Sequence, residues 1–131
     1  MTNTMNAQAA LDRLQILYTA SVSDLRRAVK TFLETGERPD PQARAEGLFA
    51  YPRLRVSWFG ERPMHLETRA FGRLSRPGVY ETTITRPDLY GPYLIQQLDL
   101  LERDYGARFE VEPSDQEIPF PYVLDGSDVV L

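Results

Sequence analysis

The clearest pattern along the chain is an apolar stripe near its amino end. Apolar residues recur there every three or four positions, at Leu11, Leu14, Tyr18, Val22, Leu25, Val29 and Phe32. This spacing predicts one long amphipathic helix, for which Gly36 is a suitable stop. A capping box at Ser21 and Asp24 is an alternative that would split the helix in two. We expect one helix because the stripe crosses that point without a change of phase.

Alternation with period two replaces the helical pattern in the middle of the chain. Leu54, Val56 and Trp58 alternate with polar neighbours and predict a first strand. We expect the following segments to be a strand over Thr68 to Arg73, a turn over Ser75 to Gly78, and a strand over Val79 to Thr85. A fourth strand is expected around Phe109 and Val111, and prolines stiffen the extended segment after it.

Two further helices complete the predicted fold. A short one begins at Asp40-Pro41 and runs to Gly47. The other carries its apolar face at Tyr90, Leu94, Leu98, Leu101 and Tyr105. Because proline lacks an N–H, we expect regular helix only from Pro92, after a turn or irregular first turn over Arg86 to Gly91. The fold class predicted for residues 1–131 is α+β, a two-layer sandwich in one domain. A mainly antiparallel sheet of about four strands packs against two main helices, one of them the long N-terminal helix, plus the short helix.

Composition excludes several kinds of site. The 131 residues contain no cysteine, so disulfides, thiolate metal sites and cysteine nucleophiles are excluded. The net charge of −4 argues against a general nucleic-acid binder. No apolar run is long enough to span a membrane, and the first residues lack the pattern of a signal peptide. We therefore expect a cytoplasmic protein that binds neither nucleic acid nor membrane.

No complete catalytic centre is recognisable in the sequence. His65 is the only histidine, which leaves no basis for a Ser-His-Asp triad or a multi-histidine metal site. The many acids near the carboxyl end fit alternating exposed strand positions more simply than a glycosidase pair. A glycine-rich phosphate loop is absent. We predict no catalytic residue, no metal ligand and no covalently bound cofactor.

The charge is unevenly distributed, and this draws attention to residues 68–88. Residues 53–87 carry seven Arg against three Glu, whereas residues 88–131 carry two basic and ten acidic side chains. Side chains alternate along strands, so the two strands of this segment can present one shared surface. Guanidinium and hydroxyl groups suit a phosphate, and a helix start follows. The candidate phosphate-binding residues are Arg69, Arg73, Tyr80, Thr82 and Arg86. The alternative is that the arginines cover a sheet and pair with acids such as Glu67, Glu81 and Asp88.

Several motifs in one register resemble the N-terminal domain of bacterial AMP nucleosidase. They are Gly47-Leu48-Phe49 with Tyr51-Pro52, Thr68-Arg69-Ala70-Phe71-Gly72-Arg73, Thr82-Thr83-Ile84-Thr85-Arg86-Pro87, Asp104-Tyr105-Gly106-Ala107, and Glu117-Ile118-Pro119 with Pro121-Tyr122-Val123 and Asp125-Gly126-Ser127. The resemblance implies a two-layer α/β unit regarded as regulatory, followed in the family by a phosphorylase-like catalytic domain. The family enzyme hydrolyses AMP to adenine and ribose 5-phosphate, is activated by ATP with magnesium, is inhibited by phosphate, and forms a hexamer.

From the resemblance we expect a regulatory, oligomer-organising domain of an AMP nucleosidase, inactive by itself. The apolar ending Val129-Val130-Leu131 suggests a segment cut before its catalytic partner domain. The expected partners are that domain in the same polypeptide, a nucleotide or phosphate effector, and further copies in a homo-oligomer. Two alternatives stay open. The domain is purely structural, or it lends phosphate-binding residues to a shared active site, through Arg86 or the segment Tyr122 to Ser127.

Overall fold

The longest element is a single helix at the amino end. The computed structural model describes residues 4–38, 49–58, 74–76 and 79–118. Helix α1, Ala7–Thr35, is unbroken, which confirms the prediction of one helix. Asn6 caps its start, where the side-chain oxygen accepts the N–H of Ala9 at 2.9 Å. Gly36 ends it with a φ of 78°, a left-handed conformation that glycine adopts without a Cβ clash.

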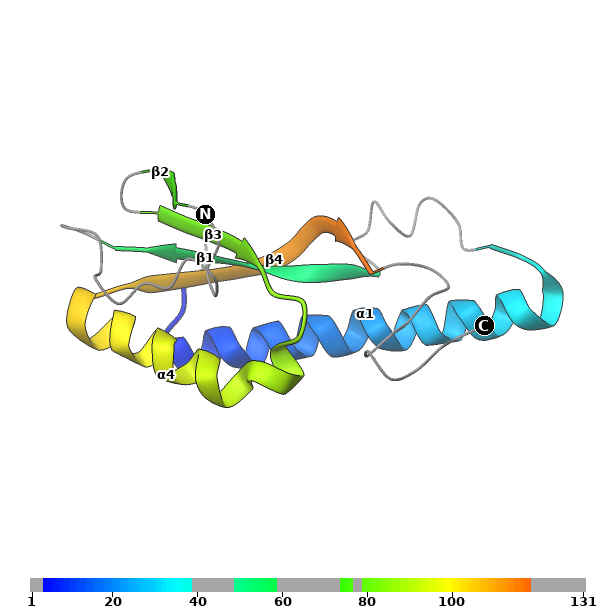
Figure 1. Cartoon of the computed structure of the whole chain (residues 1–131), viewed down its shortest axis with the longest axis horizontal. Coiled ribbons are helices and arrows are strands. Elements are labelled where there is room, and N and C mark those ends of the chain that lie inside the picture. Colours follow the sequence, from blue (N-terminus) through cyan, green and yellow to red (C-terminus); the bar gives the residue numbers. More distant parts are fainter. Residues whose placement is uncertain (1–3, 39–48, 59–73, 77–78, 119–131) are drawn as a thin grey trace.

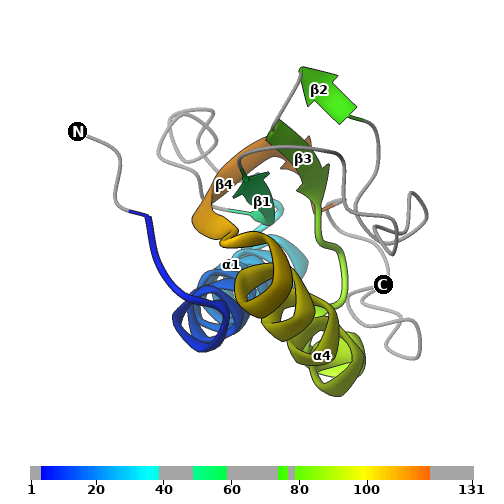
Figure 2. The ribbon, with the colours of Figure 1, turned by 90° about the vertical axis from the view of Figure 1, so that its left-hand side faces the viewer.

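An antiparallel sheet forms the second layer. Its strands are β1 (Ala50–Ser57), β2 (Leu74–Arg76), β3 (Val79–Thr83) and β4 (Arg108–Glu117). They lie in the order β2-β3-β1-β4, and every neighbouring pair is antiparallel. Helix α1 and helix α4 (Pro87–Tyr105) both pack on the same face of this sheet (Figures 1 and 2). The α+β class and the two-layer arrangement are therefore confirmed, whereas the short helix expected before Gly47 lies outside the described residues.

The predicted strand boundaries need two corrections. A turn was expected from Ser75, but β2 occupies Leu74–Arg76, because pairing with β3 holds these residues extended. The strand expected to reach Thr85 ends at Thr83 instead. Ile84 follows it and donates its N–H to the carbonyl of Pro52 at 2.9 Å. Since Pro52 has no N–H to return, the ladder between β1 and β3 stops there.

The start of the second main helix was also predicted wrongly. Helix α4 is regular from Pro87, and Pro92 lies inside it. Pro87 suits the first helical position because its missing N–H would have no partner there. Pro92 removes the bond to the carbonyl of Asp88, but both residues are exposed, so water can hydrate that carbonyl. Tertiary packing of the helix thus outweighs the local cost of one proline.

Strand β4 is longer than predicted and tolerates a proline because it lies at an edge. Met5 and Phe109 exchange both backbone hydrogen bonds, at 2.8 and 3.1 Å, on the outer side of β4. Period two places the nitrogen of Pro113 on that same outer side, where its missing N–H breaks no bond to β1. Beyond Pro113 the register between β4 and β1 shifts. At this irregular point the hydroxyl of Ser114 accepts a hydrogen bond from the backbone N–H of Gln116 at 3.1 Å.

The buried side chains form two separate clusters. The main cluster lies between the sheet, the first half of α1 and α4, and includes Leu14, Leu54, Leu98 and Phe109. A smaller cluster lies under the second half of α1, where the buried members among the described residues are Leu25, Val29 and Ile118. Figure 1 shows the reason: α4 runs back along the first half of α1 only, so the second half extends beyond it.

Candidate functional site

Tyr80 and Thr82, two of the predicted phosphate-binding residues, lie on the helix-facing side of the sheet. They pair with Val56 and Leu54 of β1, whose side chains are in the main core. Tyr80 is only 1% exposed, and its ring centroid lies 6.4 Å from that of Trp58. The alternation along β3 was therefore predicted correctly, but it directs Tyr80 into the core instead of an open surface. Thr82 is half-buried beside it.

Arg86 stands at the turn where β3 leads into α4. It is the N-cap residue of α4, and its side chain is 22% exposed. Its guanidinium contacts Asp88 through two bonds, Nε to Oδ1 at 3.2 Å and Nη2 to Oδ2 at 3.1 Å. This is the pairing that the alternative interpretation of the sequence predicted. Among the described candidates, Arg86 is the basic group that lies at a helix start, where backbone N–H groups favour an anion.

Electrostatics at this helix start already favour a negative charge. The hydrogen bond from Arg86, followed by its charge and by the backbone N–H groups of Asp88 and Leu89, lowers the pKa of the Asp88 carboxyl. Burial raises the pKa of the Tyr51 hydroxyl, and the charge of Arg86 opposes that rise. Asp88 is thus the negative charge that Arg86 and this helix start stabilise, and the charge of the same guanidinium also acts on the Tyr51 hydroxyl. One signal in the sequence pointed to Tyr51, namely its place in the Tyr51-Pro52 motif.

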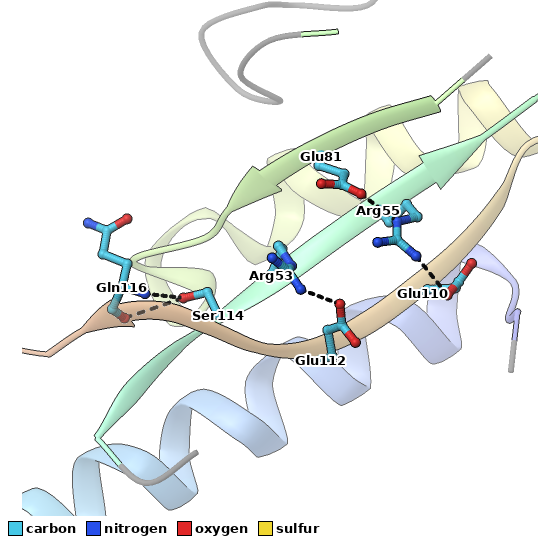
Figure 3. Close-up of polar contacts among 7 residues, drawn as sticks. All are labelled: Arg53, Arg55, Glu81, Glu110, Glu112, Ser114 and Gln116. Carbon is cyan, nitrogen blue, oxygen red and sulfur yellow. Dashed lines mark hydrogen bonds and ion pairs between the residues drawn. The ribbon is translucent and has the colours of Figure 1, made fainter. Parts of the chain in front are cut away.

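The opposite face of the sheet carries a lattice of ion pairs (Figure 3). Arg55 on β1 contacts Glu81 of β3 at 2.7 Å and Glu110 of β4 at 3.4 Å, and Arg53 contacts Glu112 of β4. The bond to Glu81, more than any other interaction, raises the pKa of Arg55. Strand register produces these pairs, because residues directly opposite each other point to the same face. Arg53 and Arg55 therefore cover the sheet and pair with acids, as the alternative interpretation of the charge pattern predicted.

In the described part of the chain, neither a metal cluster nor a membrane-spanning helix accompanies Arg86. Arg69 and Arg73 lie outside the described residues. Within residues 4–38, 49–58, 74–76 and 79–118, no group of three His, Cys, Asp or Glu side chains is placed to hold a metal ion. Neither helix in the described part of the chain is long and apolar enough to cross a membrane. Of the candidate residues in the described part of the chain, Arg86 is therefore the one at the start of α4, where it pairs with Asp88.

Known proteins match this chain over nearly its whole length. The family described as the bacterial AMP nucleoside phosphorylase N-terminus matches residues 9–131. The chain belongs to this family. An AMP nucleosidase of Escherichia coli K12 is 52% identical to it over 122 residues, which are 93% of this chain and 25% of the relative. An AMP nucleosidase of Escherichia coli O157:H7 gives the same figures.

The residues at and near the start of α4 lie inside the region that matches the AMP nucleoside phosphorylase N-terminus family. Tyr51, Arg86 and Asp88 all fall between residues 9 and 131. The chain spans about a quarter of the length of the curated relatives it matches. It is therefore homologous to the N-terminal part of a larger polypeptide, which confirms the family suggested by the sequence motifs.

Proposed function

We propose that this chain is the regulatory and oligomer-organising N-terminal region of an AMP nucleosidase. The full-length enzyme would hydrolyse AMP to adenine and ribose 5-phosphate, with the catalytic chemistry outside residues 1–131. The observation that supports this is the family match over residues 9–131, together with relatives named AMP nucleosidase of which the matched residues make up 25%. The described residues hold no catalytic constellation, so the chain by itself is expected to release no adenine from AMP.

The regulatory part of the proposal concerns Arg86. A phosphate group of a nucleotide effector, or inorganic phosphate, would bind at Arg86 and the first turn of α4, where Asp88 now lies. Arginine forks and helix N-termini both favour phosphate oxygens. Magnesium would arrive with the nucleotide, since the described residues build no carboxylate centre for it. Regulation further requires that the ligand bind two states of the enzyme with different affinity.

The test compares two arginines of the same helix in the full-length polypeptide. Arg86→Gln removes the proposed phosphate contact, whereas Arg103→Gln is a matched control that removes an exposed pair with Asp104 at the other end of α4. AMP hydrolysis is measured against ATP and against phosphate. We expect Arg86→Gln to weaken both effector responses by about tenfold, the loss of one charge-assisted contact. Arg103→Gln should behave as wild type.

Two other outcomes would reject this assignment. If Arg86→Gln raises the KM for AMP and leaves the effector responses intact, the residue belongs to a shared active site. If neither response changes, the effector does not use Arg86. Asp88→Asn adds an independent check, because removal of the competing carboxylate should tighten phosphate binding to Arg86, as measured by calorimetry.

A further inference from the structure

The residue that precedes β1 has an unusual backbone conformation. Phe49 has a φ of 63°, and within the described part of the chain it is the one residue other than glycine with a positive φ. At this φ the Cβ atom crowds the carbonyl oxygen, so bulky residues seldom adopt it. Glycine adopts it freely, as Gly36 and Gly106 do after α1 and α4. Phe49 is therefore strained, and its surroundings must hold it in place.

Two contacts hold Phe49 in this conformation. Its carbonyl accepts the backbone N–H of Ile118 at 2.5 Å, one residue beyond the pairing of Ala50 with Glu117. Its side chain is partly buried and packs against the small cluster that contains Leu25. Figure 1 shows that the start of β1 and the end of β4 meet over the second half of α1. The left-handed conformation is thus the one in which Phe49 contacts both the end of β4 and α1.

The sheet is irregular between this contact and the main ladder. The pairing of β1 with β4 jumps from Pro52–Pro113 to Ala50–Glu117, so three residues of β4 lie opposite one residue of β1. Extra residues of this kind interrupt the hydrogen bonds of the ladder. The end of the sheet beyond the irregularity can therefore open while the main ladder stays paired.

We infer that Phe49 and Ile118 form a strained two-state contact that couples the end of β4 to the second half of α1, residues 22–35. In the closed state, Phe49 is left-handed, its carbonyl binds Ile118 and its ring packs on the small cluster. In the open state, Phe49 returns to the extended region, which removes the strain and withdraws the ring. Because the closed state carries the strain, the two states lie closer in free energy than they would with an unstrained residue. A displacement of Ile118 is thereby transmitted to α1.

The strain is tested by substitutions that differ only in the Cβ atom of residue 49. Phe49→Ala and Phe49→Gly both remove the ring, but only alanine keeps the strain. Urea unfolding should show Phe49→Gly to be the more stable, by about fivefold in the folding equilibrium constant. The cost of a Cβ at positive φ exceeds the extra freedom of glycine in the unfolded chain. Ala50→Gly is the matched control, because Ala50 lies inside β1. There glycine should lower the equilibrium constant by at least about twofold.

The coupling is tested by hydrogen exchange in the same variants. Amides of residues 22–35 that exchange faster than the main core report local opening and not global unfolding. If the contact couples these residues to β4, they and the Ile118 amide should all exchange about fivefold more slowly in Phe49→Gly than in Phe49→Ala. Slower exchange of the Ile118 amide alone would overturn the coupling. So would exchange of residues 22–35 only together with the main core.

The inference also fails if Phe49→Ala is at least as stable as Phe49→Gly, because residue 49 would then carry no strain. Should both of these variants unfold, Phe49→Asn and Phe49→Val give a second comparison. Asparagine tolerates the left-handed conformation and valine does not, so Phe49→Asn should be the more stable although valine is the more apolar. The reverse order would reject the strain. Effector binding at Arg86 plays no part in these measurements, so the inference and the proposed function can fail separately.

Discussion

The two halves of α1 pack against different sets of neighbours. The first half packs against both α4 and the sheet, in a cluster that holds Leu14, Leu98 and Phe109 at 0% exposure. Among the described residues, the second half of α1 (residues 22–35) has no counterpart of α4 beside it, and its small cluster joins Leu25 and Val29 to buried Ile118 with partly buried Phe49 and Tyr51. In the described part of the chain, one continuous helix therefore joins a large buried cluster to a small one. Local stability along a helix is therefore expected to depend on the elements packed against it and not on its own sequence pattern.

The largest expected effect comes from the same substitution in each half. Leu98 and Leu25 are both 0% exposed, so Leu→Ala removes the same atoms in both cases. Leu98→Ala should cost about 4 kcal/mol, because the two-layer core around it cannot collapse onto the cavity. Leu25→Ala should cost about 2 kcal/mol, the lower end of the range, because the thin cluster can relax. Urea unfolding measures both values, and equal losses would contradict the comparison.

Hydrogen exchange measures the stability of the two halves of α1 separately. Leu25→Ala should accelerate amide exchange in residues 22–35 of α1, while Leu98→Ala accelerates it throughout the chain, because only the main cluster couples all the described elements. An acceleration confined to α4 in the Leu98 variant would mean that the two clusters unfold independently.

A smaller effect is expected where α1 and α4 touch. Gly91 is buried inside α4, and a Cβ there would meet only the end of the Gln15 side chain, at 3.0 Å. That end can move, so Gly91→Ala should stabilise the protein by about 0.5–1 kcal/mol through the helix propensity of alanine. Thermal unfolding measures the gain. A loss of stability would show that Gln15 is held in place and that glycine is required for the close approach of the helices.

The smallest effect concerns the pair at the start of α4. Because Arg86 lowers the pKa of Asp88 in the folded chain, the pair stabilises the fold above the unfolded pKa of about 3.9 and loses this contribution as pH falls through the folded value. Asp88 is 47% exposed, so the contribution should be below about 1 kcal/mol. Asp88→Asn should cost this amount at pH 7 and nothing at acid pH, in urea titrations. A pH-independent cost would assign it to packing.

Elements with a strong repeating pattern were predictable from the sequence, and those held by pairing were not. The stripe of α1 and the alternation around Leu54 and Phe109 gave correct elements, because burial on one face imposes the pattern. The strand at Leu74–Arg76 has no pattern of its own and depends on its bonds to β3. The start of α4 was predicted wrongly, because proline was expected to interrupt a helix at Pro92. Packing along the whole helix outweighs that local preference.

The candidate site was predictable in part. The Arg86–Asp88 pair is local, two residues apart, so the sequence indicated it directly. The pairs of Arg53 and Arg55 join positions 26 to 59 residues apart, and they require the strand register, which alternation alone does not supply. Tyr80 shows the same limit, since period two gives which residues share a face but not which face is buried.

The backbone bridge between Met5 and Phe109 has a consequence for how the protein behaves at high concentration. Strand β4 is a ten-residue edge, and bare edges act as templates for strand addition between molecules. Met5 occupies one pairing position on that edge, and Pro113 lacks the donor at another, four residues along. Only a short run near Val111 lies between them, too brief to seed a stable intermolecular sheet. Deleting the first five residues would therefore favour aggregation of a protein whose fold is otherwise intact.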